Sequence, residues 1–174
     1  MTQINSSQSD NPASSPAGSH DQGMILRWWS RLAPLPGGRL LFSLALGWLA
    51  PYSGSVGARV EEIHPGYARV SIRERRRLRN HLRSVHAIAL INLGELATGL
   101  AVLSTISGNM RGILLNIQAD YLKKARGKLV ASAEFELPQP LLDNTSCEVE
   151  ACLRDQSGDT VTRVRATWLI GYKA

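Results

Sequence analysis

The chain has 174 residues, of which 44% are hydrophobic and 20% are charged. This length predicts one domain with its own core, and the composition excludes a wholly disordered or fibrous protein. Twenty Lys and Arg against 14 Asp and Glu give a net charge of +6. The charge favours an anionic partner but does not choose between nucleic acid, membrane lipid and a phosphorylated cofactor. The apolar runs are too short to predict a membrane-spanning helix.

Residues 1–23 are rich in Ser, Asn, Gln and Pro and predict a disordered tail. Residues 24–52 then predict a helical segment. Its first helix covers residues 24–32, and its second runs from Arg39 to Leu49 and ends at Pro51.

The first of these helices allows two interpretations. Trp28 and Trp29 lie among Arg27 and Arg31, a pattern that suits an anchor on an anionic membrane surface. The polar face is short and weakly basic, however. We therefore favour a lid that packs on the main domain.

Residues 53–174 predict that main domain. From Val56 to Ile72 apolar residues alternate around a turn at residues 64–67, which indicates a β-hairpin. A long apolar helix from His86 to Ile106 follows. Four more strands are predicted at 112–121, 128–137, 146–154 and 160–172. Strands on both sides of one very apolar helix predict an α+β fold, an antiparallel sheet wrapped around a central helix.

The two cysteines, Cys147 and Cys152, are five residues apart on a predicted strand and should point to opposite faces. This spacing argues against a disulfide and against a shared metal site. With no signal peptide predicted, a cytoplasmic location is expected.

The long helix is apolar on nearly all sides, so its polar residues are informative. Asn92, Glu95 and Thr98 or Gly99 recur at three- and four-residue spacing and predict one polar stripe. Glu95 is the only charge in the segment. It is either a solvated residue or a functional carboxylate, and the residues alone do not decide between the two.

The start of this helix is a second candidate site. His86 lies at or next to the first turn, and Ser84 is a candidate N-cap. Unpaired N–H groups of His86, Ala87 and Ile88 would bind an oxyanion. Nine residues separate His86 from Glu95, about 13.5 Å along a helix, so one chain cannot bring both to one reaction. A shared site predicts an obligate dimer.

The spacing of Asn80, His86 and Glu95 resembles the signature of hotdog-fold acyl-CoA thioesterases of the phenylacetate-thioesterase type. Their pattern is Asn-x-x-Gly-x-x-His-Gly-Gly, followed further along the long helix by a catalytic Asp or Glu. Three runs resemble more narrowly a bacterial hotdog branch, the domain of unknown function DUF4442: Ala50-Pro-Tyr-Ser53, Asn80-His-Leu-Arg-Ser-Val-His86 and Asn92-Leu-Gly-Glu95. The resemblance covers about residues 30–173.

The resemblance implies a role for each matched residue. Glu95 would be the general base or nucleophile, and Asn80 would orient the water or the substrate. The N–H of Ala87 would polarise the thioester carbonyl, and His86 would hold the loop and the helix start. Arg83 and Ile88 stand where the family has Gly. A non-catalytic hotdog protein that binds acyl-CoA or fatty acyl chains is therefore the alternative to an acyl-CoA thioesterase.

Two basic clusters are candidates for binding the phosphates of coenzyme A, which would enter as part of the substrate rather than as a cofactor. They are Arg75, Arg76 and Arg77, and Lys123, Lys124 and Arg126. A solvated cationic loop is the alternative. Nucleic acid is not expected, because the chain has few aromatic residues for base stacking. No metal site is expected, and the expected assembly is a homodimer or a dimer of dimers.

Overall fold

The computed structural model describes residues 23–142 and 144–173. The predicted tail, residues 1–23, lies outside the described residues except for Gly23. Three helices come first: α1 (Met24–Leu32), α2 (Gly38–Leu49) and α3 (Pro51–Val56). They are followed by β1 (Arg59–His64), β2 (Tyr67–Arg73), the 3-10 turn η1 (Arg76–Leu78), α4 (Ala87–Thr105), β3 (Met110–Tyr121), β4 (Lys128–Glu134), β5 (Thr145–Arg154) and β6 (Thr160–Tyr172).

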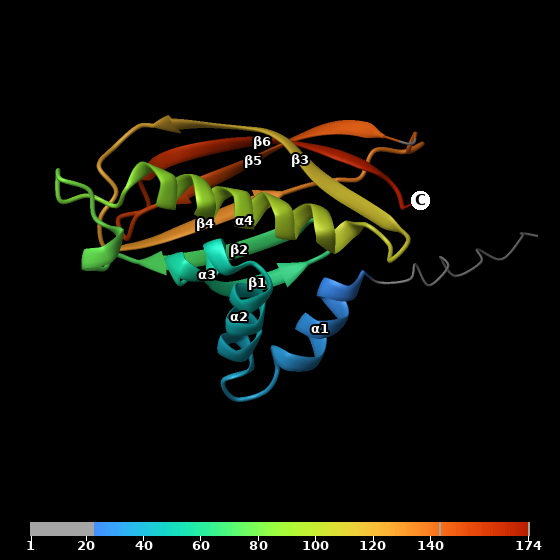
Figure 1. Cartoon of the computed structure of the whole chain (residues 1–174), viewed down its shortest axis with the longest axis horizontal. Coiled ribbons are helices and arrows are strands. Elements are labelled where there is room, and N and C mark those ends of the chain that lie inside the picture. Colours follow the sequence, from blue (N-terminus) through green and yellow to red (C-terminus); the bar gives the residue numbers. More distant parts are fainter. Residues whose placement is uncertain (1–22, 143, 174) are drawn as a thin grey trace, which may run out of the picture.

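The six strands form one antiparallel sheet in the order β1-β2-β4-β5-β6-β3. The sheet curves around α4, which packs against all six strands (Figure 1). This arrangement confirms the predicted α+β fold with one central helix. The two edges of the sheet are β1, beside the N-terminal helices, and β3.

The apolar sequence of α4 suits this central position. Leu93, Ala97 and Ala101 are fully buried against the sheet. α4 is also long and apolar enough to cross a membrane, contrary to the sequence prediction, but 67% of its most apolar window is buried inside the protein. The position of α4 in the core of the domain therefore explains its apolar sequence.

Gly94 sets how closely α4 approaches β6. A Cβ atom at this position would lie 2.5 Å from Cβ and Cγ2 of Val164, which is fully buried. We expect Gly94→Ala to lower the free energy of unfolding by about 2 kcal/mol, because the helix or the strand must shift. Urea denaturation would measure the loss. Adding Val164→Ala should restore part of it, and a strictly additive double variant would contradict this packing.

Several element boundaries differ from the predicted ones. Val56 ends a third helix, α3, instead of starting a strand, so the helical part of the chain runs beyond residue 52. Pro51 begins that helix, and Gly57 ends it with a left-handed φ of 70°. β4 stops at Glu134 rather than at residue 137, and Phe135 instead donates its N–H to the carbonyl of Gly66.

The cysteines are free, as predicted, and lie on opposite faces of β5. Cys147 packs against the core, whereas Cys152 is on the outer face near Glu150.

The N-terminal helices pack on the β1 edge of the sheet. Leu26 and Trp29 of α1 are buried, and the Trp29 ring meets the Phe42 ring edge-on at 5.1 Å. Ser43 of α2 accepts a hydrogen bond of 2.9 Å from the N–H of Val60 in β1. One side of α1 is therefore attached to the domain, while Trp28 on the other side stays exposed.

Candidate active site

The first turn of α4 leaves one backbone donor open. His86 is the N-cap, and its Nδ1 accepts a 3.2 Å hydrogen bond from the N–H of Ile88. The N–H of His86 donates to the carbonyl of Leu78 at 2.7 Å. Of the three predicted donors, only the Ala87 N–H has no partner among residues 23–142 and 144–173.

Ser84 is not the N-cap, contrary to the sequence prediction. Its hydroxyl donates to the carbonyl of Ala125 at 2.9 Å, and the N–H of Val85 donates to the same carbonyl. These bonds hold the loop before α4 against the connection between β3 and β4. His86, which lies two residues later, caps the helix instead.

Asn80 shapes this loop. Its Oδ1 accepts hydrogen bonds from the N–H groups of Leu82 at 2.9 Å and Ser84 at 3.1 Å. The carbonyl oxygen of the side chain is thus committed to the backbone, and its amide nitrogen is the part left to meet a ligand.

The backbone conformation at position 83 accounts for the glycine that the resembled pattern has there, because the φ of Arg83 is +54°. Residues with a Cβ adopt this left-handed conformation at a cost. We expect Arg83→Gly to raise the free energy of unfolding by about 0.5–1 kcal/mol, the relieved strain exceeding the added flexibility of the unfolded chain. Thermal unfolding would measure it, with Arg75→Gly, at an extended φ of −134°, as the control that should not stabilise. An unchanged or lower melting temperature for Arg83→Gly would contradict this explanation.

A first cavity, of about 360 Å³, opens beside the free donor. It is lined by Asn80, Leu82, Ser84, Val85, Ala87, Leu90, Tyr121, Leu122, Lys123, Lys124 and Ala125. Tyr121 donates its hydroxyl to the carbonyl of Ala87 at 3.3 Å. The cavity therefore brings together two predicted catalytic residues, Asn80 and Ala87, and two predicted phosphate ligands, Lys123 and Lys124.

The two lysines differ in whether the side chain is free to bind a phosphate. Lys123 Nζ contacts Asp155 Oδ2 at 3.0 Å and Asp159 Oδ2 at 2.5 Å, and these carboxylates raise the pKa of the lysine. Lys124 is exposed and forms no ion pair within the described part of the chain. Lys124 is thus the better placed of the two to meet a phosphate.

Glu95 does not line this cavity and lies more than two turns further along α4. Its side chain is half-buried, and burial raises the pKa of its carboxyl group. It forms no ion pair with any described residue. Ile91 and Ile88 lie four and seven residues before it on the same side of α4. We call this the open side of the helix, because Ile88 is exposed and Ile91 and Glu95 are only partly buried.

The predicted polar stripe is wrong for the other members. Thr98 is fully buried and accepts a 3.3 Å hydrogen bond from the indole N–H of Trp168 in β6. Asn92 is buried on the side of α3, where its Nδ2 donates to Ser53 Oγ at 3.1 Å. Of the predicted stripe, only Glu95 lies on the open side of α4, next to Ile88 and Ile91.

Sequence reasoning gave no role to the pair of Ser53 and Asn92. Asn92 Oδ1 is buried and has no hydrogen-bond partner, so the pair joins α3 to α4 one turn before Glu95 with one acceptor unsatisfied. Both residues belong to the two short runs that carry the family resemblance. Their place in these two runs was the feature of the sequence that could have pointed to the pair.

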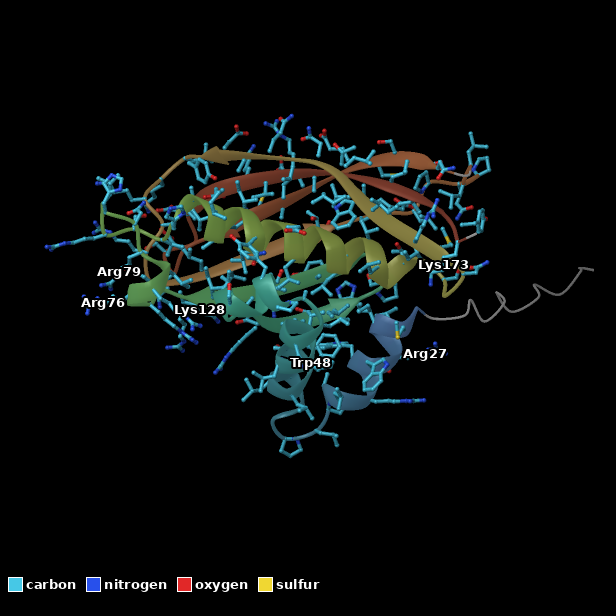
Figure 2. The ribbon with its side chains drawn as sticks, viewed as in Figure 1. Arg27, Trp48, Arg76, Arg79, Lys128 and Lys173 are labelled. Atoms are coloured by element: carbon cyan, nitrogen blue, oxygen red, sulfur yellow. The ribbon has the colours of Figure 1, made fainter. Side chains whose placement is uncertain are left out.

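The arginine cluster borders a second cavity, of about 270 Å³. It is formed by α2, α3, β1 and Leu96 of α4, together with Arg75 and Arg77, whose guanidinium groups both lie against Gly57. Four of the six predicted phosphate ligands are therefore divided between two cavities, Arg75 and Arg77 in one and Lys123 and Lys124 in the other, while Arg76 and Arg126 line neither of them. Figure 2 shows Arg76, Arg79 and Lys128 at the end of the molecule where α4 begins.

Glu74 fastens this basic loop. Its Oε2 accepts the N–H of Gly127 at 2.7 Å, and its Oε1 lies 2.5 Å from Arg79 Nε. The hydrogen bond from Gly127 and the charge of Arg79 lower the pKa of Glu74. The loop is thereby tied to the turn before β4.

The chain resembles a known protein family and several solved structures. The model of the family described as a domain of unknown function, DUF4442, matches residues 38–170. The chain belongs to the DUF4442 family. The match begins at the first residue of α2 and includes α2, α3, α4 and all of the sheet except the last two residues of β6. None of the curated proteins matches the sequence.

Solved structures place this DUF4442 protein among hotdog folds. A structural-genomics protein with no function in its name is 29% identical, with a TM-score of 0.74 over 86% of this chain and 99% of its own. Thioesterase SAV0944 from Staphylococcus aureus is 18% identical, with a TM-score of 0.62 over 70% of this chain and 98% of its own. Thioesterase HI1161 from Haemophilus influenzae is 18% identical, with a TM-score of 0.63 over 73% of this chain and 88% of its own.

Proposed function

We propose that this protein hydrolyses acyl thioesters of coenzyme A at a site shared by two copies of the chain. The observation that carries the proposal is the single open N–H of Ala87 in a cavity with Asn80, on the same helix as an unpaired, half-buried Glu95. The names of structurally similar thioesterases support the same class of reaction.

The chemistry assigns the groups as follows. Glu95 takes a proton from water while the water oxygen attacks the thioester carbonyl carbon. The Ala87 N–H donates to the carbonyl oxygen as it becomes negatively charged, and the Asn80 amide orients the water or the substrate. When the C–S bond breaks, the thiolate takes the proton from Glu95, which leaves the free acid and the thiol. A raised pKa makes Glu95 a better base near neutral pH.

A dimer through the β3 edge would supply the missing half of each site. β3 has 12 residues and ends the sheet, so the backbone groups on its outer side have no strand to pair with in the described chain. Ile113 and Leu115 on this strand are exposed, as is Ile88 on the open side of α4. A long apolar edge strand is a surface that a second copy can extend.

The phosphates of coenzyme A would bind at the basic end of the molecule. Lys124 lies in the cavity of Ala87, and Arg75 and Arg77 border the second cavity. Arg76 lies at the end of the molecule where α4 begins, and Arg126 follows Ala125, whose carbonyl binds the loop before α4. Arginine and lysine at the mouth of a site bind phosphate through charge-assisted hydrogen bonds.

Release of free thiol from acyl-CoA esters of different chain lengths tests the proposal. We expect saturable turnover with at least one ester, and a sedimentation experiment should show a dimer or larger assembly. A strictly monomeric active protein would contradict the shared site.

A non-catalytic binding protein is the second candidate, and Ile88 favours it. This side chain is exposed next to Ala87, where the resembled pattern has Gly, so it narrows the space around a bound carbonyl. Calorimetry would then show saturable acyl-CoA or fatty-acid binding without thiol release.

A further inference from the structure

The N-terminal helices and the turn between α1 and α2 leave large hydrophobic side chains exposed. We call these nine residues the helical apolar face: Met24, Trp28, Leu35, Leu40, Leu41, Leu44, Trp48, Leu49 and Tyr52. Each is at least 44% exposed, and Trp48 reaches 86%. Leu41, Leu44 and Trp48 follow one another on one side of α2 at three- and four-residue spacing. Soluble monomers rarely expose an apolar area this rich in large side chains, so the face indicates a docking surface.

The charges of the chain segment that carries this face have one sign, and the nearby Glu61 of β1, which shares a pocket with Arg39 and Leu40, is paired with Lys128. From Gly23 to Val60 the sequence has four arginines and neither Asp nor Glu. Arg31 and Arg39 are exposed on α1 and at the start of α2, beside the helical apolar face. Tryptophan and arginine around leucine-rich helices suit the boundary between lipid headgroups and acyl chains, where anionic lipid attracts the arginines.

A second copy of the chain fits this face less well. In a two-fold dimer the same surface meets itself, so the arginines of one copy would face those of the other without an acidic residue of the segment between them. The helices also lie at the β1 side of the sheet, away from the β3 edge that offers a better surface for pairing (Figure 1).

We propose that the helical apolar face docks the protein on the surface of an anionic lipid bilayer. α2 has 12 residues and is about 18 Å long, too short to cross a hydrocarbon core of about 30 Å, so the helices lie in the interface. Figure 2 shows Trp48 and Arg27 on this part of the molecule. Leu40 and Leu44 also line the second cavity, so a docked bilayer lies against its rim.

Co-sedimentation of the full chain with vesicles tests the proposal. The vesicles contain phosphatidylcholine, either alone or mixed with phosphatidylserine. We expect binding to the mixed vesicles that weakens as NaCl is added. The double variant Leu44→Ser/Trp48→Ser should lower the partition coefficient at least about tenfold. Arg31→Gln/Arg39→Gln should lower it about tenfold on mixed vesicles and much less on neutral ones.

Matched controls separate docking from general changes in charge and hydrophobicity. Leu142→Ser removes an exposed leucine outside the face, and Arg163→Gln removes an exposed arginine on β6. Both should bind vesicles as the wild type does. Glu95→Gln should also bind normally, so a failure of the hydrolysis proposal leaves this test unaffected.

Three results would overturn the proposal. Wild-type protein could stay in the supernatant with mixed vesicles, or Leu44→Ser/Trp48→Ser could sediment with them unchanged. Light scattering could also show that this double variant has a smaller assembly than the wild type, in which case a second copy covers the face.

Discussion

Glu95→Gln should lower kcat/KM for acyl-CoA hydrolysis by about 10³-fold while the protein stays folded. The substitution keeps the size of the side chain and removes the group that accepts the proton from water. Because burial raises the pKa of Glu95, the folded state holds this proton more tightly than the unfolded chain. Its contribution to stability is therefore lost as pH rises from the unfolded pKa through the folded one. Near neutral pH the Gln variant should melt at the same or a higher temperature than the wild type.

The pH dependence of the wild type gives a second readout of Glu95. Activity should rise with pH as the carboxyl group loses its proton, with a midpoint above the ordinary pKa of a glutamate. Glu148→Gln, which changes an exposed glutamate on the outer face of β5, serves as the control with unchanged kinetics. Equal kcat/KM for Glu95→Gln and the wild type would remove Glu95 from the mechanism.

Ala87→Pro should lower kcat by about 10²- to 10³-fold, because it deletes the open N–H that would bind the oxyanion. Position 87 is the first residue of α4, where proline fits the helix. His86 before it has an extended conformation with ψ of 140°, which a following proline requires. The backbone therefore accepts this change, and Ala87→Ser, which keeps the N–H, is the control that should retain activity.

Mixing the two inactive variants distinguishes a shared site from a site within one chain. When Glu95→Gln and Ala87→Pro chains pair at random, half of the dimers are mixed, and each mixed dimer holds one site with both wild-type groups. About a quarter of the wild-type activity should return. If refolded mixtures stay inactive while mixed dimers are demonstrated by mass, each chain carries its own complete site.

The sequence predicted the fold well where one residue pattern dominated. α4 is apolar on nearly all sides, and apolar and polar residues alternate in the strands from β3 to β6, so the predicted positions of these elements were close to the observed ones. The cap of α4 was missed because it depends on Ala125, about forty residues away, which binds the hydroxyl of Ser84. The sequence around Ser84 does not indicate a hydrogen bond to a residue so distant in the chain.

The prediction of one polar stripe on α4 was wrong for a related reason. Helical spacing places Asn92 and Thr98 near Glu95, but α3 covers the first and β6 covers the second. Which side of a helix remains open depends on what packs against it. The resemblance supplied the candidate residues of the site, whereas the separation of Asn80, Ala87, Lys123 and Lys124 from Arg75 and Arg77 into two cavities became visible only in the structure.

The link between Ser53 and Asn92 has a consequence for how this family can vary. A buried amide that loses its only partner leaves two unsatisfied groups, at a cost of about 1–3 kcal/mol each. Ser53→Ala alone should therefore be poorly tolerated, because it leaves the Asn92 amide without a hydrogen-bond partner. Asn92→Leu alone should also be poorly tolerated, because it removes the donor to Ser53 Oγ and places a side chain of different shape against α3. Replacing both residues removes every unsatisfied group at once, including the lone Asn92 Oδ1. Among relatives of this chain, we expect positions 53 and 92 to covary. The contact between the N-terminal helices and the helix of Glu95 would then be kept or lost as a pair of residues.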